Sequence, residues 1–389
     1  MQKKLIALVI ASFVSGSSFA QSNVNISGVL ALGLSSTKLS NLNPTRAASF
    51  SSANETRLDD QTSRIIFSGE ESLGNGTSLY FLVATIFALD MGAGNGGIWA
   101  NGPSRVGFKG PWGDISAGRD DIHYVAYTLG GIEQTEYWNG GSFQDTVNYN
   151  LLDNVAGQPI AFNTRANNII KYETPKVSGF VGTFAYSPNP AGNEGQATAA
   201  TSNGNYSSGS AYNAALRYAN GPIQAVFSTW NYKVEGRPVG TITYANADQE
   251  STKVGFAYSF PMGLQVGFGW DKSTLKRVGA VGAQNDVSRT GWMLPIFYTF
   301  GANRLAFNYG RVSDLAGAPI TNQTGARNLV LGETYSLSRR TSVGLWYSKL
   351  TNDKNSAVNL FASGSPAAGS AVMAGESVTQ LYAGITHRF

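Results

Sequence analysis

Hydrophobic and polar residues alternate with a period of two along most of this chain. In the segment 253–260 every second residue is Val, Phe or Tyr, and the residues between them are mostly small or polar. The same alternation recurs at 264–271, 292–300 and 305–309. Because successive side chains of a β-strand point to opposite faces, each of these segments predicts a strand with one apolar face.

The connections between the predicted strands differ in length in a regular order. Seven are tight turns, at 74–76, 111–113, 176–178, 220–222, 261–263, 301–303 and 338–340. Eight are long polar loops, at 35–61, 91–98, 120–165, 187–209, 233–250, 274–287, 314–325 and 352–375. Short and long connections alternate, which predicts an all-β fold of sixteen antiparallel strands. A transmembrane β-barrel has this arrangement, whereas a soluble β-sandwich has no reason to sort its loops by length.

The alternation continues to Phe389, the last residue of the sequence. Strand sixteen, roughly 377–389, is expected to pair with strand one, near 23–34, because unpaired strand edges are not tolerated in a membrane. Ile385 and Phe389 share the side expected to face lipid. Phe389 is therefore predicted to lie in the aromatic girdle at the rim that carries the short turns.

One charged residue departs from the predicted pattern. Glu333 shares the lipid-facing side of its strand with Leu331 and Tyr335. A charged side chain is unfavourable on that side. Either a β-bulge, which would turn the side chain inward, or a subunit interface would accommodate it.

The first residues have the features of an export signal. Two lysines precede an apolar run at 5–14 that is too short to cross a bilayer, and small residues follow at 18 and 20. This pattern predicts a secretory signal peptide at 1–20. No linker or change in composition interrupts the remainder, so residues 21–389 are predicted to form a single barrel domain.

The composition agrees with an exported β-protein. The chain has no cysteine, and it contains 46 Gly, 18 Tyr and 20 Phe. After the predicted signal, no apolar stretch reaches the roughly 18 residues that a transmembrane helix requires. The formal net charge is only +4, two units of which belong to the signal peptide. Such a balance does not suggest a nucleic-acid binder.

Five stretches resemble, in order, landmarks of the Gram-negative general porins. They are "TSRIIFSGEESLGNGTSLYF", "PSRVGFKGPWGDISAGRD", "RANNIIKYETPKVSGF", "YSLSRRTSVGLWYSK" and "GITHRF". The betaproteobacterial and neisserial type is the most similar. The resemblance implies a trimeric barrel in the outer membrane, with a third loop that folds into the lumen and narrows it. It implies passive diffusion of small hydrophilic solutes and ions, with no reaction and no cofactor.

The resemblance also implies partners for the assembled protein. These are two further copies of the chain, outer-membrane lipid and lipopolysaccharide, and the barrel assembly machinery. Phe389 matches the terminal aromatic residue that this machinery is implied to recognise.

The candidate functional residues belong to the third long loop and the wall that it faces. The loop, about 120–165, is the longest insertion, and long loops of compact folds are usually functional. Its acidic residues Glu133, Glu136 and Asp145 are expected to form one side of a constriction.

Arginines are expected on the opposite side of this constriction. Arg64, Arg119 and Arg165 match the positions of the arginine cluster that the resemblance implies. Arg105 repeats the pattern around Arg64 one hairpin later. Arginine is costly on a lipid-facing surface, so these side chains belong in the lumen. Opposed charges there would order permeating ions, whereas the alternative reading is that some of these arginines only anchor the loop by ion pairs.

Two other functions stay open at this stage. A substrate-selective channel would need a ladder of aromatic side chains along the lumen, and strand three offers only Tyr80 on its inward side. A barrel hydrolase would need a nucleophile paired with a histidine or an acid. His123 and His387 are the only histidines, and they are too far apart in sequence to predict a metal cluster.

Overall fold

The structure is a computed structural model that describes residues 23–46, 54–61, 63–94, 99–126, 165–190, 209–234, 241–242, 247–280, 282–360 and 372–389. The predicted signal peptide, 1–20, and most of the third loop, 127–164, lie outside these residues. Within the described ranges the only helix is α2 (His123–Ala126), a single turn. In the same ranges, no helix is long and apolar enough to cross a membrane.

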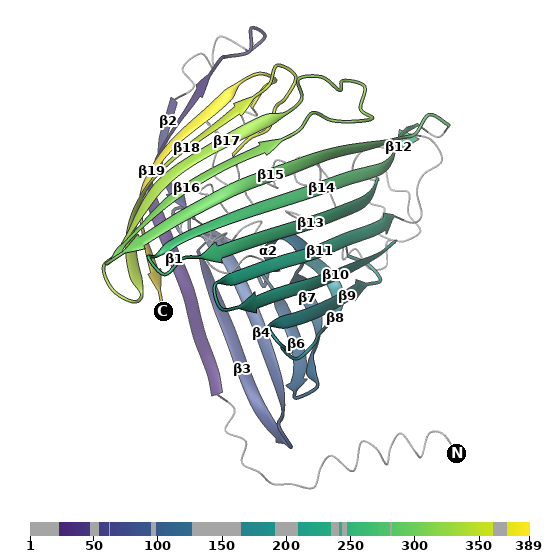
Figure 1. Cartoon of the computed structure of the whole chain (residues 1–389), viewed down its shortest axis with the longest axis vertical. Coiled ribbons are helices and arrows are strands. Elements are labelled where there is room, and N and C mark those ends of the chain that lie inside the picture. The colour runs from purple at the N-terminus through teal and green to yellow at the C-terminus, as the bar shows by residue number, and fades with distance from the viewer. Residues whose placement is uncertain are drawn as a thin grey trace.

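The rest of the regular structure is β-sheet (Figure 1). The strands are β1 (Asn23–Ser40), β2 (Asn54–Asp60), β3 (Arg64–Gly74), β4 (Thr77–Ala88), β5 (Ala93–Gly94), β6 (Ser104–Gly110), β7 (Gly113–Asp121), β8 (Arg165–Glu173), β9 (Phe180–Ser187), β10 (Gly209–Asn220), β11 (Ile223–Val234), β12 (Thr241–Ile242), β13 (Asp248–Ser259), β14 (Leu264–Ala280), β15 (Asn285–Phe300), β16 (Asn303–Val312), β17 (Ala326–Ser336), β18 (Thr341–Asn352) and β19 (Ser377–Arg388).

These nineteen segments make a barrel of sixteen spanning strands. Strands β2 and β3 pair with successive parts of β1, so together they form one spanning strand. Strands β5 and β12 are two-residue extensions beyond the wall. Each of the other strands pairs antiparallel with its neighbours along the chain, which confirms the predicted fold class.

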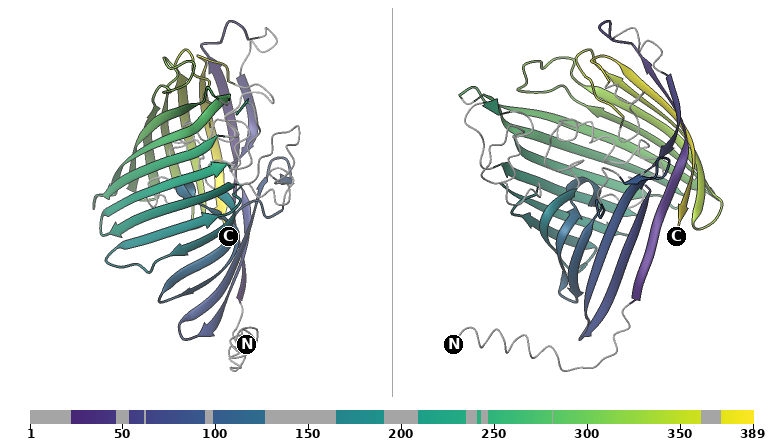
Figure 2. Two further views of the ribbon diagram at one scale, coloured as in Figure 1. Left: turned by 90° about the vertical axis from the view of Figure 1, so that its right-hand side faces the viewer. Right: turned by 180° about the vertical axis from the view of Figure 1, so that it is seen from behind.

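The barrel closes between its first and last strands, as predicted. Strand β19 pairs with β1 from Val29↔Arg388 to Ser40↔Ser377. The backbone N–H of Gly28 donates to the carbonyl oxygen of Phe389 at 3.0 Å, and the N–H of Phe389 donates back at 3.2 Å. Figure 2 shows the two strands side by side. This pairing removes the last free edge of the sheet.

The seven tight turns lie where the sequence predicts them, and three strands extend further than predicted. Strand β1 continues to Ser40, β14 continues to Ala280, and β15 begins at Asn285. The expected loops at 35–61 and 274–287 are therefore partly strand. These extensions carry polar residues on both faces, so they lack the apolar alternation that identified the other strands.

The outer wall is apolar and the inner wall is mostly polar. Val106 and Phe108 are 49% and 45% exposed, and they alternate with Arg105 and Lys109, which lie on the inner side. Outward-facing aromatic or aliphatic residues recur on the other strands, among them Ile170, Phe184, Phe227, Phe256, Phe268, Phe307 and Leu345. An apolar band around a closed barrel is the surface that faces lipid in transmembrane barrels.

Glu333 does face outward from this apolar band. Its neighbours Leu331 and Tyr335 on the same side of β17 are both 45% exposed. The pairing of β17 with β16 and β18 runs without interruption past Glu333, which lies opposite Leu305 and Leu345. Of the two alternatives for Glu333, the β-bulge is therefore excluded, and the subunit interface stays open.

Candidate functional site

The third loop leaves the wall at the end of β7 and enters the barrel. His123 has a φ of 50°, an uncommon backbone conformation for a residue other than glycine, and it begins the helical turn α2. Its ring nitrogens lie 2.8 Å from Ser228 Oγ and 2.9 Å from Ser251 Oγ, on β11 and β13. Because both serines face inward, α2 lies inside the barrel against the wall formed by β11, β13 and β14.

A buried polar network fixes α2 to this wall. The Tyr124 hydroxyl donates to Asp271 Oδ2 at 2.7 Å, and Ser251 Oγ donates to the same oxygen at 2.5 Å. Lys253 Nζ donates to the carbonyl oxygens of Tyr124 and His123, at 3.1 and 3.4 Å. Lys253 and Asp271 are both 0% exposed and lie opposite each other on β13 and β14. Sequence reasoning missed this network, because nothing local marks these residues as partners of the loop.

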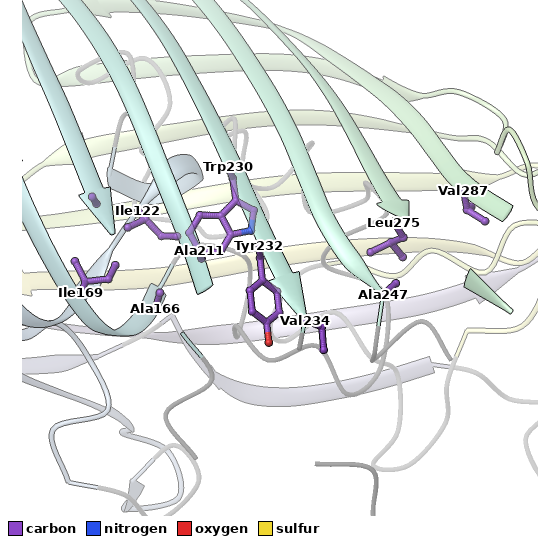
Figure 3. Close-up of a cluster of buried hydrophobic side chains, with 11 residues drawn as sticks. Ile122, Ala166, Ile169, Ala211, Trp230, Tyr232, Val234, Ala247, Leu275 and Val287 are labelled. Atoms are coloured by element: carbon purple, nitrogen blue, oxygen red, sulfur yellow. The ribbon is translucent and has the colours of Figure 1, made fainter. Parts of the chain in front are cut away.

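The interior beside α2 is packed with apolar side chains. One cluster extends along β8 and β11 to the long-loop ends of β14 and β15 (Figure 3). It includes Ile122, Ala166, Ile169 and Trp230. Trp230 is 2% exposed, and its Nε1 donates to Gln249 Oε1 at 3.2 Å. This apolar packing lies beside the point where the third loop enters the barrel.

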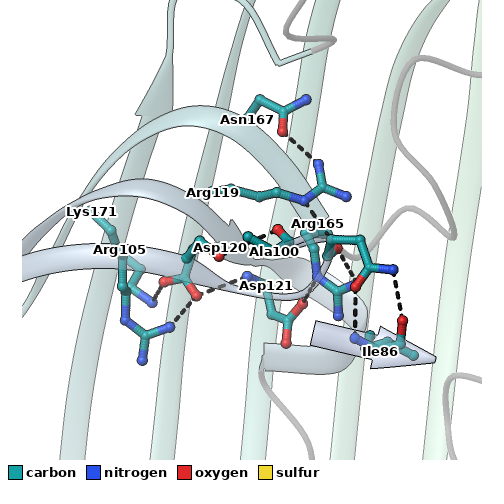
Figure 4. A network of polar contacts seen from close by, with 11 residues as sticks. Ile86, Ala100, Arg105, Arg119, Asp120, Asp121, Arg165, Asn167 and Lys171 are labelled. Carbon is teal, nitrogen blue, oxygen red and sulfur yellow. Dashed lines mark hydrogen bonds and ion pairs between the residues drawn. The ribbon is translucent and has the colours of Figure 1, made fainter. Parts of the chain in front are cut away.

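Two adjacent carboxylates mark the point where β7 ends. Asp120 forms ion pairs with Arg105 of β6 and Lys171 of β8. Asp121 forms an ion pair with Arg165 at 2.7 Å (Figure 4). Two of the four predicted arginines therefore pair with the first residues of the third loop.

Arg119 has no carboxylate as a hydrogen-bond partner among the described residues. Its guanidinium donates to Asn167 Oδ1 at 2.5 Å and to the carbonyl oxygen of Asn101 at 3.3 Å (Figure 4). Arg165 also donates to the carbonyl oxygen of Asn101, at 3.5 Å. The register of β7 shifts between Gly118 and Asp120, so the regular alternation of sides is interrupted at Arg119.

Arg64 is the fourth predicted arginine, and it faces the lumen from β3. It lies opposite Val29 of β1, and Arg388 of β19 lies opposite the same residue on the other side. The Arg64 guanidinium is attracted by the carboxylate of Asp121 and repelled by Arg388 and Arg165. Among the described residues it forms no hydrogen bond or ion pair.

The fold therefore gathers three of the predicted arginines around one carboxylate. Arg64, Arg119 and Arg165 all interact electrostatically with Asp121. Arg105 belongs to a second group, around Asp120. The predicted acidic residues Glu133, Glu136 and Asp145 lie outside the described residues. Sequence reasoning did not include Lys171 and Arg388, which the barrel brings to the same region from β8 and β19.

The arrangement can act on ions by its charge. Among the described residues, three guanidinium groups share the carboxylate of Asp121, and charges inside a pore are screened less than charges at an open surface. Within the described part of the chain, no group of three His, Cys, Asp or Glu side chains could hold a metal ion.

Comparisons with known proteins agree on one family. A sequence model described as Gram-negative porin matches residues 6–356. The chain is 28% identical to Outer membrane porin protein 32 of Delftia acidovorans over all of both chains. It is 25% identical to the major outer membrane protein P.IB of Neisseria gonorrhoeae, covering 88% of this chain and 91% of the relative.

Solved structures show the same fold. An anion-selective porin from Comamonas acidovorans superposes with a TM-score of 0.74 at 22% identity, over 95% of this chain and all of the other. OmpF from Salmonella typhi superposes with a TM-score of 0.59 at 16% identity, over 94% of this chain and 97% of the other.

Proposed function

Because this chain belongs to the Gram-negative porin family and forms an outer-membrane channel for passive diffusion, we propose that its constriction favours small anions over cations. The observation that carries this proposal is the cluster of Arg64, Arg119 and Arg165 around the single carboxylate of Asp121. A porin turns over no substrate, so we propose no catalytic reaction.

Among the described residues of the constriction, the basic side chains also outnumber the carboxylates with which they pair. Arg105 and Lys171 share Asp120 in the same way. Each carboxylate thus leaves at least one positive charge uncompensated. A ring of positive charge in a pore lowers the energy of an anion and raises that of a cation. A relative of similar fold is named an anion-selective porin, which supports this direction.

The acidic side of the constriction is also part of the proposal. Glu133, Glu136 and Asp145 are proposed to face the arginines from the third loop and to create a transverse field across the passage. The alternative, that the arginines only anchor the loop, fits Arg105 and Arg165, which pair with Asp120 and Asp121. Arg64 forms no ion pair with the part of the loop that the structure describes, so the anchoring alternative has no support there.

The channel is proposed to be a homotrimer. The outer face of β1 is aliphatic, with Val24, Ile26 and Leu34 exposed by 67%, 57% and 59%. An aromatic-poor face suits protein contact, whereas aromatic belts mark lipid contact. Residues 1–20 are proposed to be the export signal, and Phe389 to be the residue that the assembly machinery recognises. Lipid and lipopolysaccharide are proposed partners of the outer wall.

Planar-bilayer recording tests the channel and its selectivity. The purified protein is expected to produce discrete conductance steps, and the reversal potential under a KCl gradient is expected to have the sign of chloride preference. A cation-selective reversal potential at low salt would contradict the proposed selectivity. If the folded barrel showed no conductance, the proposal that it conducts ions would be wrong. Native mass spectrometry from mild detergent is expected to give the trimer, and a monomer would contradict the proposed assembly.

A further inference from the structure

One asparagine side chain fixes the segment that precedes β6 to the wall of the barrel. Asn101 Oδ1 accepts a hydrogen bond from the backbone N–H of Ile86 at 2.7 Å, and Asn101 Nδ2 donates to the carbonyl oxygen of Ile86 at 2.9 Å. Two opposed residues of an antiparallel strand pair exchange hydrogen bonds in the same way. The regular pairing of β4 with β6 ends at Val83 and Ser104. The amide of Asn101 therefore takes the place of a strand residue beyond that end.

The backbone on either side of Asn101 is attached to the same strand. The N–H of Ala100 donates to Thr85 Oγ1 at 3.2 Å, and the N–H of Gly102 donates to the carbonyl oxygen of Ala84 at 3.0 Å. A Cβ added to Gly102 would lie 2.8 Å from the Cβ of Ala84, so the segment packs directly against β4. The main-chain atoms of Asn101 are therefore held in one position relative to the wall.

The carbonyl oxygen of Asn101 is shared by two guanidinium groups. Arg119 Nε donates to it at 3.3 Å, and Arg165 Nη1 donates to it at 3.5 Å (Figure 4). A carbonyl oxygen has two lone pairs and can accept hydrogen bonds from two donors. The two guanidinium groups repel each other. Because both contact the same partially negative oxygen, part of this repulsion is offset.

The same asparagine is connected to the strand pair that carries the third arginine of the cluster. Ile86 of β4 lies directly opposite Arg64 of β3. The side chain of Asn101 thus bonds to the residue beside Arg64, and its carbonyl oxygen bonds to the two other arginines that interact with Asp121. One uncharged residue therefore links the parts of the wall that hold all three guanidinium groups.

We propose that Asn101 is a positioning residue, which holds the guanidinium groups of Arg119 and Arg165 side by side at the constriction. Its effect on ion selectivity rests on the proposed function, because that function assigns these arginines to the passage. A purely structural role would require only the two hydrogen bonds to Ile86, which end the pairing of β4. In that case the positions of the two arginines would not depend on Asn101.

A charge-neutral substitution separates the position of the arginines from their charge. Asn101→Ala removes both side-chain bonds to Ile86 and leaves the net charge of the constriction unchanged. Reversal potentials of the purified protein are measured in planar bilayers under a KCl gradient. We expect the ratio of chloride to potassium permeability at low salt to fall by roughly threefold, because the interaction of an ion with each displaced charge weakens with distance.

The matched control removes a bond of the same kind elsewhere. The side-chain amide of Asn355 donates to the carbonyl oxygen of Asn322 at 2.9 Å, at an exposed position between two long loops. Asn355→Ala should therefore leave the permeability ratio at its wild-type value.

A second measurement reports the position of the arginines without reference to ion flow. Phenylglyoxal reacts with accessible guanidinium groups, and mass spectrometry gives the labelling rate at each arginine. In N101A, Arg119 and Arg165 should be labelled several times faster than in the wild-type chain. Arg311, an exposed residue of β16, should keep its wild-type rate.

The variant R119Q/R165Q, which lacks both charges, separates failure of this inference from failure of the proposed function. If R119Q/R165Q shifts the reversal potential and N101A does not, the positioning role is wrong. If neither variant shifts it, the proposed selectivity is wrong, and the labelling rates decide the inference: unchanged rates overturn it and faster rates support it.

A longer side chain replaces alanine should N101A not fold. Asn101→Gln keeps a neutral amide, but that amide is too far from the backbone to bond both groups of Ile86 from the same position. Wild-type reversal potential and labelling rates in this variant would overturn the proposal.

Discussion

Lys253 Nζ lies 3.1 Å from the carbonyl oxygen of Tyr124, and this contact joins the wall of the barrel to the segment that enters its lumen. A fully buried ammonium group is costly unless it is paired and hydrogen bonded. Here Asp271 on the neighbouring strand supplies the opposite charge. The start of the third loop is therefore held against the inner wall of the barrel by a buried, charged side chain.

Replacing Lys253 with methionine should release α2. The variant keeps the bulk of the side chain but leaves Asp271 without its buried counter-charge, a change that costs about 3 kcal/mol or more. We expect a lower thermal midpoint and a noisier open-channel current. Lys272→Met, at an exposed outward position of the next strand, is the control. Identical stability and current noise in the two variants would show that Lys253 does not hold the loop.

Replacing Arg64 and Arg119 with glutamine should move the reversal potential toward cation preference. The double variant removes two positive charges beside Asp121, and the effect should be larger at low salt, where the Debye length is about 30 Å at 0.01 M. Zero-current potentials under a KCl gradient measure it. K38Q/K354Q removes two charges outside the lumen and should change little. E133Q/D145N should shift the potential in the opposite direction. If the arginine variant keeps the wild-type reversal potential, the arginine cluster has only a structural role.

Deleting Phe389 should reduce the folded, heat-modifiable fraction in the outer membrane. The residue closes the sheet through two hydrogen bonds with Gly28, and its ring covers that glycine, because a Cβ there would lie 2.6 Å from Phe389 Cζ. Gly28→Val should therefore impair assembly as well. Gly182→Ala is the control, since its added Cβ would meet only Thr174, at 3.5 Å. Normal folded yield for the deletion in cells would contradict the assembly role.

Replacing Glu333 with leucine should stabilise the barrel. Its carboxylate faces the apolar band beside Leu305 and Leu345, and an acidic side chain there costs up to about 1 kcal/mol. Reversible unfolding in lipid vesicles measures the gain. Glu70→Leu is the control, because Glu70 forms an ion pair with Lys109 at 2.6 Å and its loss brings no gain. A destabilised Glu333→Leu would indicate that the carboxylate has a partner in the assembled membrane.

Acid should loosen the contact between the first and last long loops. Glu376 is paired with Arg46 and accepts backbone hydrogen bonds from Asn43 and Met373, at 3.1 and 2.8 Å. Burial opposes ionisation, but these donors hold the pKa of Glu376 below its ordinary value of 4.5. The stabilisation is fully present above that value and is lost as the pH falls below it.

Hydrogen exchange of residues 41–46 measures this loss, which should appear below about pH 4.5 and be absent in Glu376→Gln. If the exchange of these residues has the same pH dependence in the wild-type chain and in Glu376→Gln, the proposed linkage is wrong.

The sequence by itself determined the wall of this barrel. Most of the strands are identified by their own alternation, and five of the seven tight turns contain glycine or proline, because these signals come from neighbouring residues. The closure by Phe389 followed from counting strands, and the choice of Arg64 and Arg165 followed from the resemblance of the motifs around them. The extensions of β14 and β15 were missed because they are polar on both faces.

Only the tertiary structure decided which side chains meet across the lumen. His123 contacts Ser228 and Ser251, more than a hundred residues away, and Arg64 shares Asp121 with Arg119 and Arg165. Such contacts depend on barrel closure and on the path of one loop, and no local pattern encodes either. The outward direction of Glu333 also required the structure, because a single bulge in β17 would have reversed it.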